Sequence, residues 1–177
     1  MRKLLFTALL ILGFNLLVPF TANAQEATPP TRTVSLNFLF GDHLFYSREY
    51  NGFSLSYIIE KTIPSTSFYV DNGVSLIGLL EKGSNGRNGL ILSLPIGLGH
   101  CFAPAEKKVV IKKFVRFAPT FGIYDSTSML GITPEMGFTI CSDKNVGISV
   151  MYDLPILYGN GDAAVIGAFG VGVNYSF

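Results

Sequence analysis

Hydrophobic and polar residues alternate along most of the chain from residue 32 onward, with a period of two residues. This period is typical of β-strands with one apolar face. Clusters of Gly, Asn, Asp, Ser and Pro divide the pattern into segments. The sequence therefore predicts eight strands, at about residues 32–41, 50–61, 66–80, 88–102, 108–124, 127–141, 145–158 and 162–177.

The last segment shows the two faces most clearly. Its small and weakly polar face runs from Ala164 and Ile166 to Asn174 and Ser176. Its apolar and aromatic face comprises Val165, Phe169, Val171, Val173, Tyr175 and Phe177. A strand between lipid and a narrow lumen has this composition. The segment resembles the C-terminal signal strand of bacterial outer-membrane β-barrels. This resemblance implies that the barrel-assembly machinery reads Val173, Tyr175 and Phe177 during insertion.

The opposite faces of the segments decide between a membrane barrel and a soluble β fold. A lipocalin-like barrel or a sandwich also alternates, but its water-facing surface carries many Lys and Glu. Here the face opposite to the apolar one carries small residues: Ser35, Asn37, Ser54, Ser56, Gly73, Ser75, Ser93, Gly97, Gly99, Gly131, Thr133, Gly137, Thr139, Gly147 and Ser149. Small residues suit a crowded lumen, and each segment reaches or exceeds the ~9–11 residues of a tilted spanning strand. We predict an all-β fold, an eight-stranded antiparallel up-and-down transmembrane β-barrel at residues 32–177.

The start of the chain has the three parts of a secretory signal. Arg2 and Lys3 precede an apolar stretch at residues 4–20, and a small-residue cleavage site follows at residues 22–24. We predict that residues 1–24 are a cleaved signal peptide and that residues 25–31 form a short periplasmic lead. Cleavage leaves a net charge of about −1. Nothing in this charge indicates a nucleic-acid partner.

Composition narrows the class further. The chain is 49% hydrophobic and only 14% charged, whereas soluble domains are roughly 25% charged. No apolar run after Gln25 approaches the ~20 residues of a membrane-spanning helix, which excludes a helical membrane protein. Cys101 and Cys141 make no disulfide scaffold or metal motif. They lie on strands separated by one intervening strand, so their Cα atoms are about 10 Å apart, beyond the ~7 Å limit for a bridge, which favours free thiols. We expect no metal and no cofactor.

The topology predicts an outer surface with short loops. With both termini in the periplasm, the outer loops fall at about residues 42–49, 81–87, 125–126 and 159–161. Short loops weaken an adhesin hypothesis that depends on long loops. Prolines 95, 119, 134 and 155 lie inside predicted strands, where each removes a ladder donor, and we expect bulges or kinks there.

Two fragments resemble a known group of barrels. Residues 93–96 and 117–122 are similar to strands of small Bacteroides-type outer-membrane barrels, including those called PorT-like, and the size resembles that of OmpA- and OmpX-like barrels. This resemblance implies an integral protein of the bacterial outer membrane. We expect a monomer that contacts outer-membrane lipids. The resemblance carries no catalytic motif.

Strand parity also predicts which charged residues face the lumen. If Asp125 and Ser126 form a two-residue turn, Tyr124 faces Thr127, and Arg116 then lies directly opposite Glu135. A lumenal ion pair there is a structural plug or, alternatively, part of a gate or an ion path. Because an eight-stranded interior is filled by side chains, we expect no general pore. The predicted lumenal polar network is Glu60, Asp71, Lys112, Arg116, Glu135 and Asp153.

A weak candidate for chemistry lies at the outer rim. His43, Asp125 and Ser126 resemble the extracellular catalytic set of the lipid A palmitoyltransferase family, which implies acyl transfer between lipids. A tight turn also selects Asp-Ser without any chemistry. The lipid A deacylase family has a His-x-Ser motif, whereas Cys101 and Phe102 follow His100 here.

Three functions remain open. The first is a non-enzymatic barrel with a structural, surface-interaction or envelope-maintenance role, and the balance of features favours this over an enzyme. The second is a lipid A-modifying acyltransferase or hydrolase. The third is a minor transporter of small apolar molecules through a lateral opening.

Overall fold

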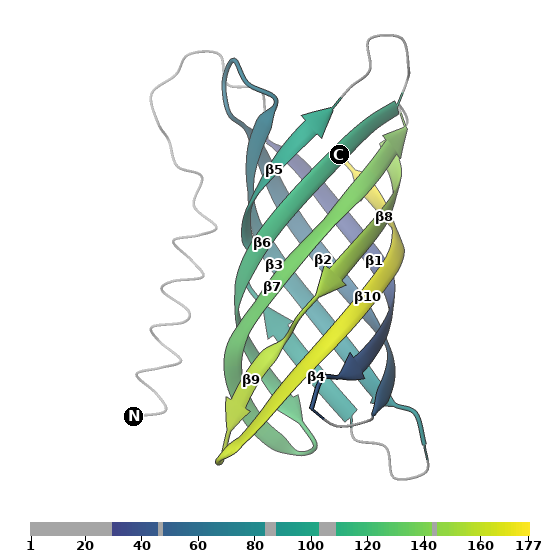
Figure 1. Cartoon of the computed structure of the whole chain (residues 1–177). Coiled ribbons are helices and arrows are strands. Elements are labelled where there is room, and N and C mark those ends of the chain that lie inside the picture. The colour runs from purple at the N-terminus through teal and green to yellow at the C-terminus, as the bar shows by residue number, and fades with distance from the viewer. Residues whose placement is uncertain (1–29, 46–47, 84–87, 103–108, 143–144) are drawn as a thin grey trace.

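A computed structural model describes most of the predicted barrel (Figure 1). The described residues are 30–45, 48–83, 88–102, 109–142 and 145–177. The predicted signal peptide and residues 25–29 of the lead lie outside them.

Every described element is a β-strand, and all pairings are antiparallel. The strands are β1 (Thr31–His43), β2 (Glu49–Thr62), β3 (Phe68–Glu81), β4 (Asn88–Ser93), β5 (Ile96–Phe102), β6 (Val109–Tyr124), β7 (Thr127–Ser142), β8 (Val146–Asp153), β9 (Ile156–Gly159) and β10 (Asp162–Ser176). β4 and β5 both pair with β3 and β6, and β8 and β9 both pair with β7 and β10. The ten strands thus form eight spans.

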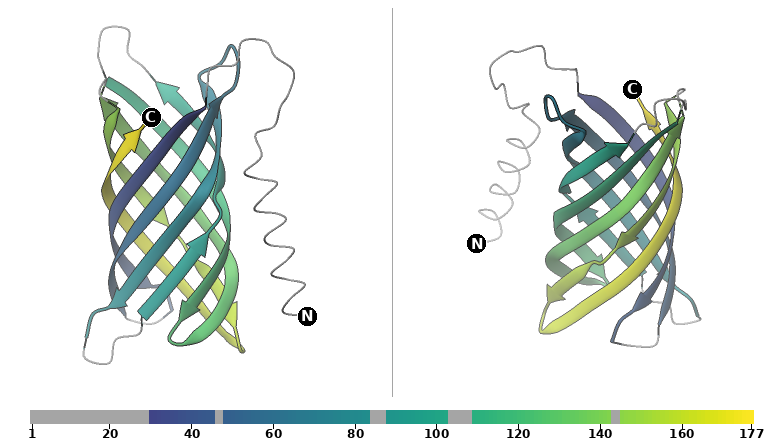
Figure 2. Two further views of the ribbon diagram at one scale, coloured as in Figure 1. Left: turned by 180° about the vertical axis from the view of Figure 1, so that it is seen from behind. Right: turned by 45° about the horizontal axis from the view of Figure 1, so that its top comes forward.

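The sheet closes on itself. β1 pairs with β2 on one side and with β10 on the other, so the described strands form a ring without a free edge. Figures 1 and 2 show the tilted strands around a narrow interior. This arrangement confirms the predicted up-and-down β-barrel.

Prolines interrupt two of the spans without shifting the register. Between β4 and β5 the partners on β3 continue in step, from Ser75 opposite Ser93 to Asn72 opposite Ile96. The wall stays bonded there, because the Gly73 N–H donates to the Pro95 carbonyl at 3.0 Å. The same holds at Pro155, and β6 and β7 pair in one register past their own prolines. The predicted bulges are therefore wrong, and the alternative of kinks at the prolines stays a prediction.

The two ends of the barrel differ. We call the end with Thr31 and Phe177 the terminal end, and the end with His43 the loop end. Two tight hairpins close the loop end, at Asp125–Ser126 and at Asn160–Gly161, and all four residues have positive φ. This conformation is that of the type I′ turn, whose twist matches paired strands.

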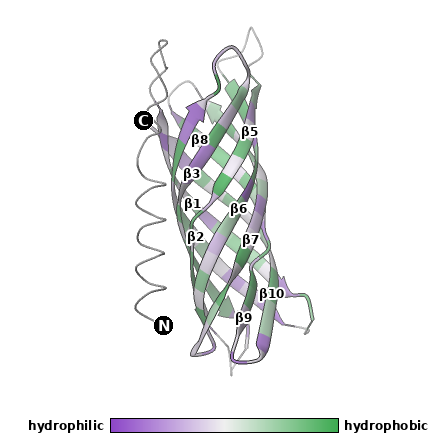
Figure 3. Ribbon diagram, turned by 90° about the vertical axis from the view of Figure 1, so that its left-hand side faces the viewer, coloured by the Kyte–Doolittle hydropathy of each residue, from purple (hydrophilic) through white to green (hydrophobic). Residues whose placement is uncertain are grey.

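The outer surface is apolar over the length of the spans. Phe38 and Phe117 point outward with 63% and 61% of their surface exposed, and hydrophobic residues recur along the strands in Figure 3. An exposed apolar surface of this extent is unfavourable in water and suits lipid contact. None of the described residues forms a helix long and apolar enough to cross a membrane.

The lumen has an apolar half and a polar half. Side chains toward the terminal end are mostly hydroxyl, amide or charged. Toward the loop end, eleven buried residues form a loop-end apolar cluster: Leu39, Tyr50, Ile77, Leu79, Ile91, Tyr124, Met129, Leu157, Ala164, Ile166 and Ala168. The small, weakly polar lumenal residues that the sequence predicts are thus typical of the polar half and not of this half.

The last strand departs from its predicted faces near its start. Val165 is only 9% exposed and does not belong to the lipid-facing surface. The Leu44 N–H donates to the Val165 carbonyl at 2.9 Å, so the connection after β1 lies against this residue. From Phe169 onward the apolar face is exposed as predicted.

Candidate functional site

The lumenal charges lie along one row of paired positions. Directly opposed residues on successive spans run from β2 to β8: Glu60, Asp71, Gly97, Arg116, Glu135 and Asp153. All the charged members are buried. The row therefore contains five of the six residues of the predicted polar network, and the sixth, Lys112, lies on β6.

Arg116 is the centre of this row. Its Nη1 donates to Glu135 Oε1 at 2.6 Å and its Nε donates to Asp71 Oδ2 at 2.8 Å. The guanidinium also lies 3.9 Å from the centroid of the Phe114 ring, a cation–π distance. The Glu135 contact has the register that the two-residue turn predicts. The Asp71 contact is one that the sequence pattern did not reveal.

Gly97 makes the Asp71 contact possible. It lies on β5 between Asp71 on β3 and Arg116 on β6. A Cβ at this position would lie 2.6 Å from Asp71 Oδ1 and would also overlap Arg116 Cγ. In the sequence, the one feature that could have predicted this pair is a glycine, Gly97, at the paired position between two opposite lumenal charges.

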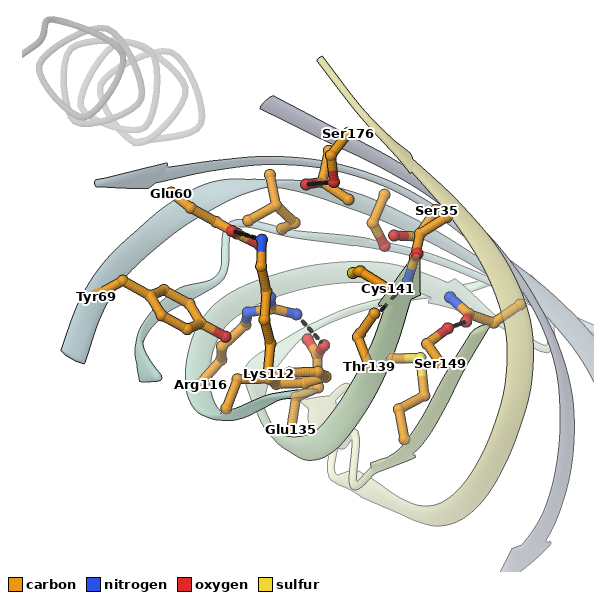
Figure 4. Close-up of a pocket in the computed structure, with 17 residues that line it drawn as sticks. Ser35, Glu60, Tyr69, Lys112, Arg116, Glu135, Thr139, Cys141, Ser149 and Ser176 are labelled. Carbon is orange, nitrogen blue, oxygen red and sulfur yellow. Dashed lines mark hydrogen bonds and ion pairs between the residues drawn. The ribbon is translucent and has the colours of Figure 1, made fainter. Parts of the chain in front are cut away.

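A small polar cavity lies between the row and the terminal end (Figure 4). Its volume is about 30 Å³, room for about one water molecule. Lys112 reaches Glu60 across the lumen to form an ion pair at this cavity. Thr139, Ser149 and other small polar side chains line the remainder.

Hydroxyl and amide groups complete the polar half. Ser149 Oγ donates to Asn37 Oδ1 at 2.6 Å, and Asn37 Nδ2 donates to Ser54 Oγ at 3.1 Å. Asn174 lies opposite Ser35, one lumenal position from Asn37 along β1. These bonds cross several spans and fix the small side chains in place.

A second, larger cavity opens at the loop end. Its volume is about 240 Å³, and its walls include His43, Arg48, Tyr124, Asp125 and Asp162. His43 was predicted to lie in a loop, but it is the last residue of β1 and its side chain is buried. The register of β1 places His43 on the lumenal face, with Leu39 and Gly41, so the loop assignment is wrong.

The three weak catalytic candidates come together only in part. His43 and Asp125 line the same cavity, whereas Ser126 is exposed on its turn and does not line it. His43 Nδ1 accepts a hydrogen bond from the Phe45 N–H at 3.2 Å. Tyr124, also in the wall, shares a hydrogen bond between hydroxyl groups with Tyr50. The cavity thus contains a base and a carboxylate without the predicted serine nucleophile.

The two thiols lie toward the terminal end, and Cys141 lines the small polar cavity there. Cys101 and Cys141 are both free, opposite Lys112 and Val110 on β6. His100 Nε2 bonds to Ser67 Oγ at 2.9 Å near the terminal end. Within the described ranges no three or more His, Cys, Asp or Glu residues group as a metal site.

Comparisons with known proteins match the chain by shape alone. No protein-family model matches it, and no curated protein sequence matches it. The crystal structure of Neisserial surface protein A, NspA, is similar with a TM-score of 0.60 at 14% identity, over 86% of this chain and 100% of that one. The outer membrane enzyme PagL is similar with a TM-score of 0.55 at 10% identity, over 80% and 98%.

These likenesses, together with the apolar outer surface, define the class. The chain has the fold of the small integral outer-membrane β-barrels.

Proposed function

We propose that this protein is a closed, non-enzymatic outer-membrane barrel with a surface-interaction or envelope-maintenance role, and that it forms no general pore. The observation that carries this proposal is the loop-end apolar cluster. Tyr50, Leu79 and Leu157 have no exposed surface at all, so side chains pack the part of the lumen that these residues occupy.

A packed apolar segment opposes passage of ions and polar solutes. An ion that enters it loses its hydration and gains no polar partner, at a cost of many kcal/mol. The polar half below offers no wide path either, because ion pairs and hydroxyl networks fill it. What remains for function is the surface that the barrel presents.

The loop end supports a surface role. With the termini in the periplasm, this end faces outward from the cell. Phe45, in the connection after β1, is 70% exposed, and Leu44 beside it is also exposed. Apolar side chains displayed on a connection suit contact with another molecule or with the lipid surface. The NspA likeness, to a protein named as a surface protein, agrees with this hypothesis.

A gene-deletion strain tests the proposal. We expect it to be more sensitive to detergents and bulky antibiotics than the parent, with an unchanged lipid A profile. The wild-type gene and His43→Ala restore resistance, whereas Phe45→Ser restores it only in part. A deletion strain with parental sensitivity, or one that loses uptake of small hydrophilic solutes, contradicts the proposal.

A second candidate is a lipid A-modifying enzyme that uses the loop-end cavity. It is supported by His43 and Asp125 lining one cavity, since a base oriented by a carboxylate activates an oxygen nucleophile. The exposed position of Ser126 counts against it. Lipid A from strains with the wild-type gene, no gene, His43→Ala or the matched control His100→Ala separates the two candidates. Equal profiles in all four eliminate the enzyme.

The proposal also covers the family of this protein and its delivery to the outer membrane. We place the chain with Bacteroides-type, PorT-like barrels, delivered by a signal peptide at residues 1–24 and inserted by the barrel-assembly machinery. In support, Tyr175 and Phe177 both face outward at the terminal end, with their rings stacked at 6.1 Å. Transport of small apolar molecules stays a prediction, and the bonded wall around Pro95 and Pro155 gives it no opening.

A further inference from the structure

We propose that the outer surface at the terminal end of the barrel binds phospholipids with anionic headgroups in preference to zwitterionic ones. In the described part of the chain, three cations face outward there: Arg32 on β1, Lys61 on β2 and Lys113 on β6. We call these three residues the terminal-end cations. The proposal goes beyond a surface or envelope role and does not depend on whether the lumen is closed.

Lys113 shows the arrangement most clearly. Its neighbours along β6, Lys112 and Phe114, line the cavity inside the lumen. Because side chains alternate along a strand, Lys113 points outward, and it is exposed. The residues directly opposite it are His100 on β5 and Phe138 on β7. Neither is an acid, so no carboxylate lies across from this ammonium group.

Arg32 and Lys61 occupy similar positions on their own strands. Arg32 alternates with the buried Thr33, and Lys61 alternates with the buried Glu60, so both cations also point outward. The strands that carry the three cations belong to one run of neighbouring spans, from β1 through β2, β3 and β5 to β6. The cations therefore lie along one side of the terminal end.

The described acids are separated from this surface. Four of them belong to the lumenal row and face inward. The other five lie at the loop end: Asp42, Glu49, Glu81, Asp125 and Asp162. The loop end has cations as well, and Lys82 bonds to Glu49 there at 2.8 Å. Among the described residues, the outer face at the terminal end thus carries side-chain charge of one sign, which attracts anions.

The cations lie where the apolar outer surface ends. On the same face of β6, Val115 and Phe117 follow Lys113 and are 51% and 61% exposed. On β1, Leu36 and Phe38 follow Arg32 in the same way, at 42% and 63%. A phospholipid whose acyl chains lie along these apolar side chains brings its phosphate group to the level of the cations. A zwitterionic headgroup adds a cation of its own, which they repel, whereas phosphatidylglycerol does not.

Native mass spectrometry of the refolded, full-length mature protein in neutral detergent micelles tests the proposal. Equal amounts of phosphatidylglycerol and phosphatidylcholine with the same acyl chains are added, and the ratio of the two bound lipids is measured. We expect wild-type protein to bind mainly phosphatidylglycerol, and added salt to weaken this preference. Lys113→Met should reduce the ratio about fivefold, the effect of one cation near an anionic surface.

Two further variants serve as a second test and as a control. Arg32→Met should reduce the ratio by a similar factor. The matched control Lys82→Met removes a loop-end cation and should keep the wild-type ratio. The shift in gel mobility on heating shows that each variant is folded.

Inorganic phosphate distinguishes a lipid headgroup from a free anion. Phosphate at the same concentration as the lipid should not displace bound phosphatidylglycerol, because it makes no contact with the apolar surface. The proposal is overturned if wild-type protein binds the two lipids equally, if inorganic phosphate displaces the lipid, or if folded Lys113→Met and Arg32→Met both keep the wild-type ratio.

Discussion

Replacing Arg116 with methionine removes the cation that holds two buried carboxylates of the lumenal row, Asp71 and Glu135. Methionine keeps much of the length and apolar bulk, so the change isolates the loss of charge. Asp71 and Glu135 then lose their partner at 2.8 and 2.6 Å. Removal of one partner from a buried ion pair costs about 3–5 kcal/mol. We expect a loss of this size in the free energy of unfolding at neutral pH.

The assay is urea unfolding in lipid vesicles, followed by the shift in gel mobility between folded and heat-denatured barrel.

Two further variants show whether charge is the cause. The triple variant adds Asp71→Asn and Glu135→Gln to Arg116→Met, so that no buried carboxylate of the two ion pairs is left without its cation. It should recover most of the stability. Lys82→Met breaks an exposed pair with Glu49 at the loop end and should change nothing measurable. The reasoning fails if Arg116→Met lies within about 1 kcal/mol of wild type, or if the triple variant is no more stable than the single one.

Three more predictions follow from single positions. Gly97→Ala should destabilise by about 1–3 kcal/mol through overlap at the Asp71–Arg116 contact, and should add little to Arg116→Met in a double-mutant cycle. Cys101 and Cys141 should both react with a maleimide after denaturation without reductant, giving two labels by mass spectrometry; a mass two hydrogens lower with no label would show a bridge. Deleting Phe177 should reduce the amount of folded barrel in the outer-membrane fraction, and an unchanged amount would remove its role in assembly.

Alternation and turn chemistry predicted much of this fold. The period of two fixed which side of each strand faces the lumen, because one face must meet lipid. The Asp125–Ser126 turn, whose residues both adopt positive φ, sets the β6–β7 register and therefore the Arg116–Glu135 pair. The local sequence is enough to predict this pair because β6 and β7 are neighbours along the chain.

Contacts across the lumen were less accessible to the same reasoning. The alternation of side chains along each strand predicts that Asp71 and Lys112 face inward. It does not predict how far their side chains reach past intervening strands. The Asp71–Arg116 contact depends on the absence of a side chain at Gly97. The pairing of Lys112 with Glu60 depends on how narrow the closed barrel is.

The loop-end apolar cluster had a sequence signal that alternation hides. Residues 90–92, Leu-Ile-Leu, and residues 156–157, Ile-Leu, are apolar on both faces, which is the mark of strands buried on both sides. Ile166 belongs to the same pattern. Where a strand is apolar on both faces, alternation alone does not distinguish the lipid-facing residues from their lumenal neighbours.

Ion current through single barrels in a planar bilayer tests the closed lumen most directly. We expect purified wild-type protein to insert without a stable open level, and a variant with Leu39, Leu157 and Ile166 all changed to Ala to show measurable conductance. Steady, large conductance from the wild-type protein would contradict the account.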